Sequence, residues 1–136
     1  MATLIDSNVI LDVLTLDPAW GDWSGAAIER VADSDKLVLN AIIYAEVSIR
    51  FSSIEELEDA LPASLIEREA VPFEAAFLAG KAFASYRRRG GAQSSTLPDF
   101  FIGAHAAIAG HRLLTRDPVR YRSYFPSVEL ISPART

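Results

Sequence analysis

Short apolar runs alternate with helix-like segments along the whole chain, and this alternation limits the possible folds more than any other feature. The runs at 2–5, 37–39, 69–71, 112–115 and 128–131 predict five short strands. Between them, apolar residues recur at helical spacing, as at Val9, Ile10 and Val13. Strands that alternate with helices favour a parallel sheet covered on both faces. We therefore expect an α/β protein with three α/β/α layers and about five short parallel strands.

Several helix boundaries are visible in the sequence. Asn40 is suited to cap a helix over 41–51, and Ser53 with Glu56 has the spacing of a capping box. Pro98 suits the first turn of a helix that Gly110 would end. We further predict a loop over 17–25, helices over 26–32 and from 73 to about 90, and a polar loop over 91–96 beside the functional site.

Length and composition indicate one globular unit. The 136 residues fit a single domain over 1–136, and half of them are hydrophobic. The absence of cysteine excludes disulfides, zinc–thiolate sites and cysteine nucleophiles, and it is compatible with a reducing compartment. The chain starts without a secretory pattern, and the apolar run at 100–110 is too short for a membrane span. We expect a cytoplasmic protein.

Charge is distributed unevenly along the chain. Residues 1–74 contain 15 acids and 4 bases, whereas residues 75–136 contain 3 acids and 9 bases. The overall charge of -5 therefore hides a basic C-terminal part. Such an asymmetry is compatible with a surface that binds a polyanion.

Four acidic residues lie far apart in the sequence but at related places in the predicted fold. Asp6 and Asp117 follow predicted strands, and Asp99 lies in the first turn of a predicted helix. Glu46 lies in the helix after the second strand. Because ligands of parallel sheets bind at the carboxyl ends of the strands, we expect these acids to meet there. Ordinary structural roles remain open for each acid, namely helix capping, a helix-dipole interaction or an ion pair with Arg50.

Glu46 is the acid that these ordinary roles explain least well. Its neighbours Ile42, Ile43 and Val47 leave little of the helix for solvent, so the carboxylate needs a partner. Two like charges about 4 Å apart repel by roughly 4 kcal/mol at an effective dielectric near 20. A hard cation such as Mg²⁺ or Mn²⁺ would compensate for this repulsion and activate a water for phosphodiester hydrolysis.

The two histidines are poorly placed for metal-free ribonuclease chemistry, which needs a positioned acid and base. His105 lies inside a predicted helix, and His111 follows its end. We interpret His105 as a core or interface residue and His111 as exposed.

The acids occur within four ordered motifs that resemble those of PIN domains. The motifs are Ile5-Asp6-Ser7-Asn8-Val9-Ile10-Leu11, the helix with Glu46, Leu97-Pro98-Asp99-Phe100-Phe101-Ile102 and Leu114-Thr115-Arg116-Asp117. The C-terminal segment 121–126 is similar to that of VapC toxins of VapBC toxin–antitoxin pairs. The resemblance covers almost the whole chain.

This resemblance implies a Mg²⁺-dependent endoribonuclease toxin, with Mn²⁺ as a possible substitute. Asp6, Glu46, Asp99 and Asp117 would form the catalytic, metal-binding quartet, with Asp6 and Asp99 as the most direct ligands. Asn8 and Thr115 would orient a carboxylate or a water. The implied partners are RNA and a VapB-type antitoxin, in a homodimer or a toxin–antitoxin hetero-oligomer.

Basic and aromatic residues provide candidate RNA contacts. Phosphate contacts position a nucleic acid without reading its bases. Trp20 and Trp23 could stack on unpaired bases, although packing is the favoured role. Arg116 is the first candidate for a phosphate contact because it adjoins Asp117. The other candidates are Arg87, Arg88, Arg89, Arg112, Arg120 and Arg122.

Other function classes remain open at this point. A receiver-like module would share the size and the acidic pocket, but it needs a lysine near a late strand, and the chain has only Lys36 and Lys81. A phosphatase with an aspartate nucleophile commonly has a second aspartate two residues on, where this chain has Asn8. A non-toxin PIN nuclease and an inactive PIN-like scaffold are the remaining alternatives.

Overall fold

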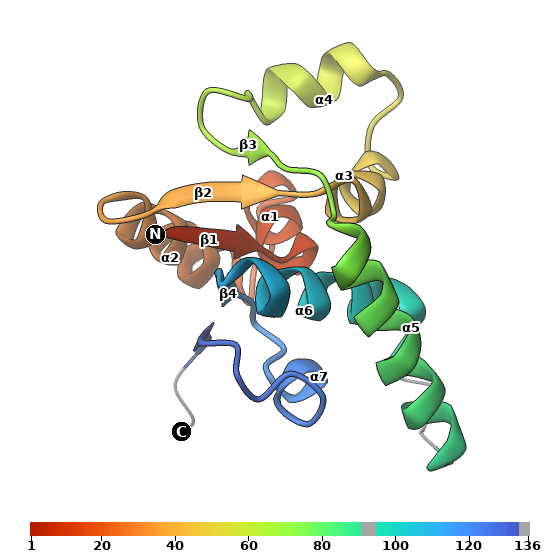
Figure 1. Cartoon of the computed structure of the whole chain (residues 1–136). Helices are drawn as coiled ribbons and strands as arrows, with labels where there is room; N and C mark the ends of the chain where they lie inside the picture. Colours follow the sequence, from red (N-terminus) through yellow and green to blue (C-terminus); the bar gives the residue numbers. More distant parts are fainter. Residues whose placement is uncertain (91–94, 134–136) are drawn as a thin grey trace.

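The structure is a computed structural model that describes residues 1–90 and 95–133. Its sheet has five parallel strands in the order β3-β2-β1-β4-β5 (Figure 1). This arrangement confirms the predicted fold class. Most of the predicted loop over 91–96 lies outside the described residues. The strands are β1 (Ala2–Ile5), β2 (Lys36–Leu39), β3 (Glu67–Arg68), β4 (Arg112–Leu114) and β5 (Leu130–Ile131).

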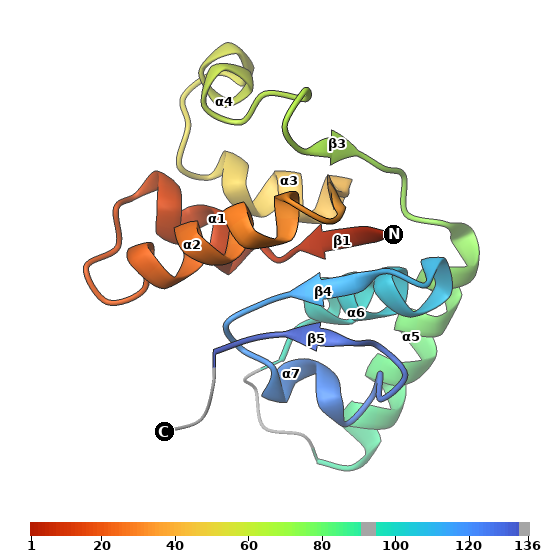
Figure 2. The same ribbon diagram turned by 90° about the vertical axis from the view of Figure 1, so that its left-hand side faces the viewer.

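Helices lie on both sides of this sheet. Figure 2 shows α1 and α2 on one side and α5 and α6 on the other, as a three-layer fold requires. None of the described helices is long and apolar enough to cross a membrane. The helices are α1 (Ser7–Leu14), α2 (Gly21–Ala32), α3 (Ala41–Ser48), α4 (Ile54–Ala60), α5 (Phe73–Arg88), α6 (Leu97–Ala109) and α7 (Val119–Arg122).

The predicted helix boundaries are largely confirmed by their capping contacts. The Asn40 side chain accepts a hydrogen bond from the Ile43 backbone N–H at 2.9 Å, which begins α3. The Ser53 hydroxyl accepts one from the Glu56 backbone at the start of α4. Gly110 ends α6 with φ of 70°, a left-handed conformation that favours glycine.

Two predicted elements are wrong in position. The predicted loop over 17–25 ends early, because α2 begins at Gly21. The Asp17 side chain accepts hydrogen bonds from the backbone of Ala19 and Trp20, so the turn needs only those few residues. The third strand lies at 67–68 instead of 69–71, since Glu69 has left the ladder after one backbone bond to Leu39.

The C-terminal segment packs closely on α6 and thereby places α7 near the carboxyl end of the sheet. A Cβ atom at Gly103 would overlap the Phe125 ring, so only glycine permits this approach. Phe125 and Tyr121 are both buried. The side chains of α7 are therefore held beside the first turn of α6.

Candidate metal-binding and catalytic site

Asp6 is the most constrained of the four predicted acids. It follows β1 directly and caps α1, with Oδ1 accepting a hydrogen bond from the Ser7 backbone at 2.8 Å. Its Oδ2 accepts hydrogen bonds from the Thr115 hydroxyl and the Tyr121 hydroxyl, each at 2.8 Å. Burial raises the pKa of Asp6, although these three hydrogen bonds and Arg120 act in the opposite direction. Asp6 is thus held in one orientation.

Asp99 faces the same region from the first turn of α6. Its Oδ2 accepts hydrogen bonds from the Thr96 backbone at 2.9 Å and the Thr96 hydroxyl at 3.2 Å, which completes a capping box. Its Oδ1 accepts a hydrogen bond from Arg120 Nη1 at 3.0 Å. The ordinary capping role and a place in the acidic site therefore coexist in this residue.

Glu46 joins the site through Ser7, the residue after Asp6. The Ser7 hydroxyl donates to Glu46 Oε1 at 2.8 Å, so the start of α1 and α3 are linked at this point. Burial raises the pKa of Glu46, and the negative charges of Asp6 and Asp99 raise it further. Ser7 is thus the partner that we expected for a carboxylate on this apolar helix. The charges of Asp6 and Asp99 also act on Glu46.

Asp117 completes the group from the segment after β4. Asn8 donates to Asp117 Oδ2 at 3.3 Å, and Arg120 Nη2 lies 3.9 Å from the same oxygen. The Thr115 hydroxyl accepts a hydrogen bond from the Asp117 backbone while it donates to Asp6. The two predicted supporting residues, Asn8 and Thr115, therefore both contact members of the quartet.

Asp99 and Asp117 both lie beside the guanidinium of Arg120, at 3.0 Å and 3.9 Å. Among the described residues, the only group of three or more potential metal ligands with atoms all within 4.8 Å of one another is elsewhere, at Glu69, His105 and His111. The oxygen ligands of the quartet nevertheless suit a hard divalent cation. Binding such an ion would require a rearrangement around Arg120.

Two residues of this site, Ser7 and Tyr121, were not predicted as parts of it. Arg120 was predicted to contact RNA, but its pairing with the acids was not predicted. Ser7 adjoins Asp6, so its proximity was available in the sequence. Arg120 lies three residues after Asp117, at the start of the short helix α7, and this short spacing brings the two side chains to 3.9 Å. Nothing in the local sequence indicates that the Tyr121 hydroxyl reaches Asp6 across 115 residues.

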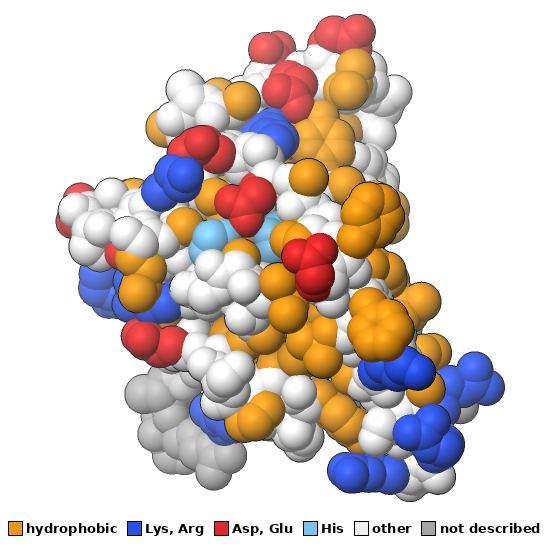
Figure 3. Space-filling model, viewed as in Figure 1, with side chains coloured by type: hydrophobic (Ala, Val, Ile, Leu, Met, Phe, Trp, Pro, Cys, Tyr) orange, Lys and Arg blue, Asp and Glu red, His pale blue; other side chains and the backbone are white. Residues whose placement is uncertain are grey.

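The arginines predicted to contact RNA differ in their surroundings. Arg116 pairs with the buried Asp12 through Nε at 2.7 Å and Nη2 at 3.1 Å, and its guanidinium lies 5.7 Å from the centre of the Trp20 ring. Arg112 pairs with Asp35 near the start of β4. By contrast, Arg87, Arg88 and Arg89 are exposed at the end of α5, where basic side chains gather on the surface (Figure 3).

A second cluster of ionisable groups lies apart from the quartet. Glu69 Oε1 is 2.8 Å from His105 Nε2 and 2.6 Å from His111 Nε2. His111 is thus largely buried, with 13% of its side chain exposed, and the prediction that it is exposed is wrong. Burial lowers the pKa of His105, against the opposing effect of Glu69. Histidine side chains are visible on this face in Figure 3.

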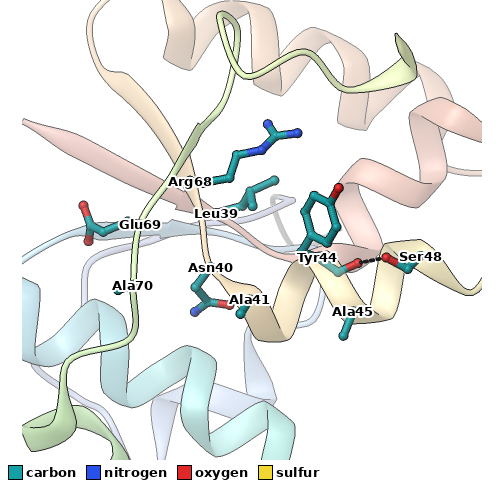
Figure 4. Close-up of a pocket in the computed structure, with 9 residues that line it drawn as sticks. All are labelled: Leu39, Asn40, Ala41, Tyr44, Ala45, Ser48, Arg68, Glu69 and Ala70. Carbon is teal, nitrogen blue, oxygen red and sulfur yellow. Dashed lines mark hydrogen bonds between the residues drawn. The ribbon is translucent and has the colours of Figure 1, made fainter. Parts of the chain in front are cut away.

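A cavity of about 650 Å³ adjoins this second cluster. Figure 4 shows Asn40 and Glu69 among its lining residues, together with Tyr44 and Ser48 of α3. The lining is mostly apolar and contains no member of the quartet. A separate cavity of about 470 Å³ is lined by Asp117, Arg120 and the side chains around them.

Comparison with known families gives a match to the PIN domain over residues 3–124. A search of curated proteins gave no significant match. Several solved structures share the fold. VapBC2 from Rickettsia felis, bound to a promoter DNA fragment, has a TM-score of 0.75 at 18% identity and covers 97% of this chain and 98% of its own.

Two further structures give similar values. VapBC-1 from nontypeable Haemophilus influenzae has a TM-score of 0.72 at 20% identity, with 97% of this chain and 98% of that chain covered. FitAcB from Neisseria gonorrhoeae has a TM-score of 0.68 at 18% identity, with 95% and 96% covered. At these identities the likeness concerns the fold.

Proposed function

Because this chain belongs to the PIN domain family, whose members are nucleases, we propose that it is a metal-dependent endoribonuclease and the toxin of a toxin–antitoxin pair. The observation that carries this proposal is the linkage of Asp6, Glu46, Asp99 and Asp117 at the carboxyl end of the sheet, through contacts with Ser7, Asn8, Thr115 and Arg120. These acids come from four separate segments, and capping alone does not account for their common position.

The quartet would hold Mg²⁺, or Mn²⁺ in its place, with Asp6 and Asp99 as the most direct ligands. When bound, such an ion supplies charge neutralisation at the scissile phosphate and lowers the pKa of water. Tyr121, Thr115 and the Ser7 backbone hold the Asp6 carboxylate in position. Asn8 does the same for Asp117.

Glu46 is suited to take up a proton during hydrolysis. Its raised pKa brings the carboxylate closer to the range in which it accepts a proton from an attacking water. The Ser7 hydroxyl fixes Oε1, and the other oxygen has no hydrogen-bond partner among the described residues. Hydrolysis in this geometry would leave a 5′-phosphate and a 3′-hydroxyl.

The arginines proposed to contact RNA differ in how accessible their guanidinium groups are. Arg87, Arg88 and Arg89 are exposed and come first, since phosphate contacts need accessible cations. Arg120 lies at the acids themselves and is half-exposed, with 39% of its side chain accessible. Arg116 comes last, because RNA would have to compete with Asp12 for its guanidinium.

We also propose a VapB-type antitoxin as the partner, in a homodimer or a toxin–antitoxin hetero-oligomer in the cytoplasm. The support is that several proteins of similar fold were solved as toxin–antitoxin complexes. A receiver-like function has less support, because neither lysine lies at the acids. Lys36 pairs with Glu67 at the start of β2, and Lys81 lies over the Phe77 ring.

The test is cleavage of total RNA by the purified chain with Mg²⁺ and with EDTA, followed by mapping of the new ends. We expect cleavage with Mg²⁺ only, and 5′-phosphate ends. Asp99→Asn should abolish it, whereas the matched control Asp59→Asn, at an exposed position of α4, should not. Equal cleavage by Asp99→Asn and the wild type would reject the proposal. Labelling by acetyl phosphate would instead favour the receiver-like alternative.

A further inference from the structure

We propose that Arg120 is a built-in countercharge of the acidic site that competes with the divalent cation for Asp99, so that it sets the metal affinity of the site. This inference rests on the proposed function, because it names what regulates metal binding by the same four acids.

The Arg120 guanidinium lies beside two acids of the quartet, Asp99 and Asp117. Its Nη1 donates to Asp99 Oδ1 at 3.0 Å, and its Nη2 lies 3.9 Å from Asp117 Oδ2. The charges of Asp99, Asp117 and Asp6 raise the pKa of Arg120, despite the larger opposing effect of burial. One guanidinium therefore lies beside two carboxylates of the quartet, as a divalent cation would.

The oxygen that Arg120 takes is the one that Asp99 has free for a metal. Asp99 Oδ2 already accepts two hydrogen bonds from Thr96 in the capping box. Oδ1 takes no part in these capping contacts, and it accepts the Arg120 hydrogen bond. Because a cation bound at Oδ1 would face a positive guanidinium at contact distance, the two cannot bind independently.

Arg120 also has space to leave this position. It belongs to α7, a helix of only four residues, and 39% of its side chain is exposed, against 8% for Asp99. Arg120 lines the cavity of about 470 Å³ that Ser123 and Tyr124 also line. The guanidinium released from Asp99 would thus remain beside the site, where a substrate phosphate would bind it.

Removal of Arg120 should therefore strengthen metal binding. We would titrate Mn²⁺ into the full-length chain by isothermal calorimetry for the wild type, Arg120→Gln and Arg122→Gln. Arg122 is exposed on the same short helix and serves as the matched control. We expect about tenfold tighter Mn²⁺ binding by Arg120→Gln, since one competing charge is lost, and a change within about twofold for the control.

Thermal unfolding provides a second readout that does not depend on activity. In EDTA, Arg120→Gln should unfold at a lower temperature than the wild type, because the acids then repel one another without a countercharge. Saturating Mg²⁺ should raise the unfolding temperature of the variant by more than that of the wild type. Arg120→Met, which keeps the aliphatic stem, replaces Arg120→Gln if the latter does not fold.

The possible outcomes separate this inference from the proposed function. Unchanged or weaker Mn²⁺ binding by the Arg120 variants, with normal binding by the wild type, would overturn the role of Arg120 and leave the proposed function intact. A wild type that binds no Mn²⁺, or one whose binding survives Asp99→Asn, would instead reject the metal site on which both depend.

Discussion

The acidic site and the Glu69 cluster both bring ionisable side chains together from distant segments, but they balance charge in opposite ways. In the acidic site, the carboxylates of Asp99 and Asp117 share the guanidinium of Arg120, and Asp6 and Glu46 lie near enough for its charge to oppose the rise in their pKa that burial causes. In the other, one carboxylate accepts hydrogen bonds from two imidazoles. The first arrangement leaves negative charge uncompensated, whereas the second satisfies its own members.

The Asn40 amide makes the second cluster a poor metal site, although its ligand atoms lie closest together. Asn40 Oδ1 accepts the Ile43 backbone N–H, so its Nδ2 faces His105 Nδ1 at 2.9 Å and donates to it. His105 Nε2 therefore carries the proton and donates it to Glu69. A metal at that nitrogen would have to displace this proton. Uncompensated charge is thus a better sign of a cation site here than proximity of ligands.

The largest expected effect separates the two regions by activity. Asp6→Asn should reduce Mg²⁺-dependent RNA cleavage by at least about a hundredfold, because it removes a proposed metal ligand. Glu69→Gln should change cleavage by no more than about twofold, since Glu69 has no part in the proposed chemistry. Initial rates at saturating Mg²⁺ measure both. A large loss of cleavage activity in the Glu69 variant would show that the Glu69 cluster also takes part in the reaction.

The second prediction concerns stability, to which the Glu69 cluster should contribute. Glu69→Ala should lower the free energy of unfolding by about 1–3 kcal/mol, because the buried His105 N–H loses its acceptor. Glu67→Ala is the matched control two residues earlier, in a half-exposed ion pair with Lys36, and should change it by less than about 1 kcal/mol. Urea denaturation measures both values, and equal losses would contradict the buried role of Glu69.

The third prediction is a pH dependence that belongs to the Glu69 cluster. The pKa of His105 is lowered in the folded protein, mainly by burial, so the unfolded chain takes up a proton first as pH falls. Stability should therefore decrease as pH falls below about 6.5, the ordinary histidine value, until the folded pKa is passed. Urea midpoints at pH 7.5, 6.5 and 5.5 measure this slope. His105→Gln should flatten it, and an unchanged slope would exclude His105 as its source.

Glu69 adds to this dependence at lower pH. Burial raises its pKa, but the hydrogen bonds and charges of His111 and His105 outweigh burial and lower the pKa overall. Its contribution to stability is present above the ordinary value of 4.5 and is lost as pH falls through the folded value. Both groups therefore destabilise the fold on acidification.

The smallest expected effect is at the link between Asp6 and Glu46. Ser7→Ala removes the hydroxyl that holds Glu46 Oε1 and should lower cleavage at limiting Mg²⁺ by about tenfold or less. Ser48→Ala is the control, because its hydroxyl bonds the Tyr44 backbone at 2.7 Å on the same helix α3. Rates as a function of Mg²⁺ concentration distinguish them. If the Ser7→Ala cleavage rate stays low even at saturating Mg²⁺, Ser7 acts in the chemical step and not in metal binding.

The sequence predicted the sheet and the positions of its acids because strand ends and helix starts have local signals. Asp6 follows an apolar run that enters a helix pattern, and Asp99 follows Pro98 in a first turn. Parallel topology then brings these ends to one edge. The site roles of the four acids remain predictions, whereas their common surroundings are a finding of the structure.

The features that the sequence did not predict depend on contacts between distant residues. Glu69 meets His105 and His111 across 36 and 42 residues, and no local pattern encodes that meeting. Arg116 adjoins Asp117, which suggested a contact at the site. Its guanidinium instead donates to Asp12, which lies 104 residues earlier in the sequence. Buried charges select their partners in three dimensions, so such pairs become visible only in the folded chain.

Metal binding by the four acids can be tested directly with an anomalous diffraction map from a crystal soaked with Mn²⁺ and measured at the manganese edge. We expect a peak among the carboxylates of Asp6, Glu46, Asp99 and Asp117, with the Arg120 guanidinium displaced from Asp99. A peak at Glu69, His105 and His111, with none at the four acids, would contradict this expectation.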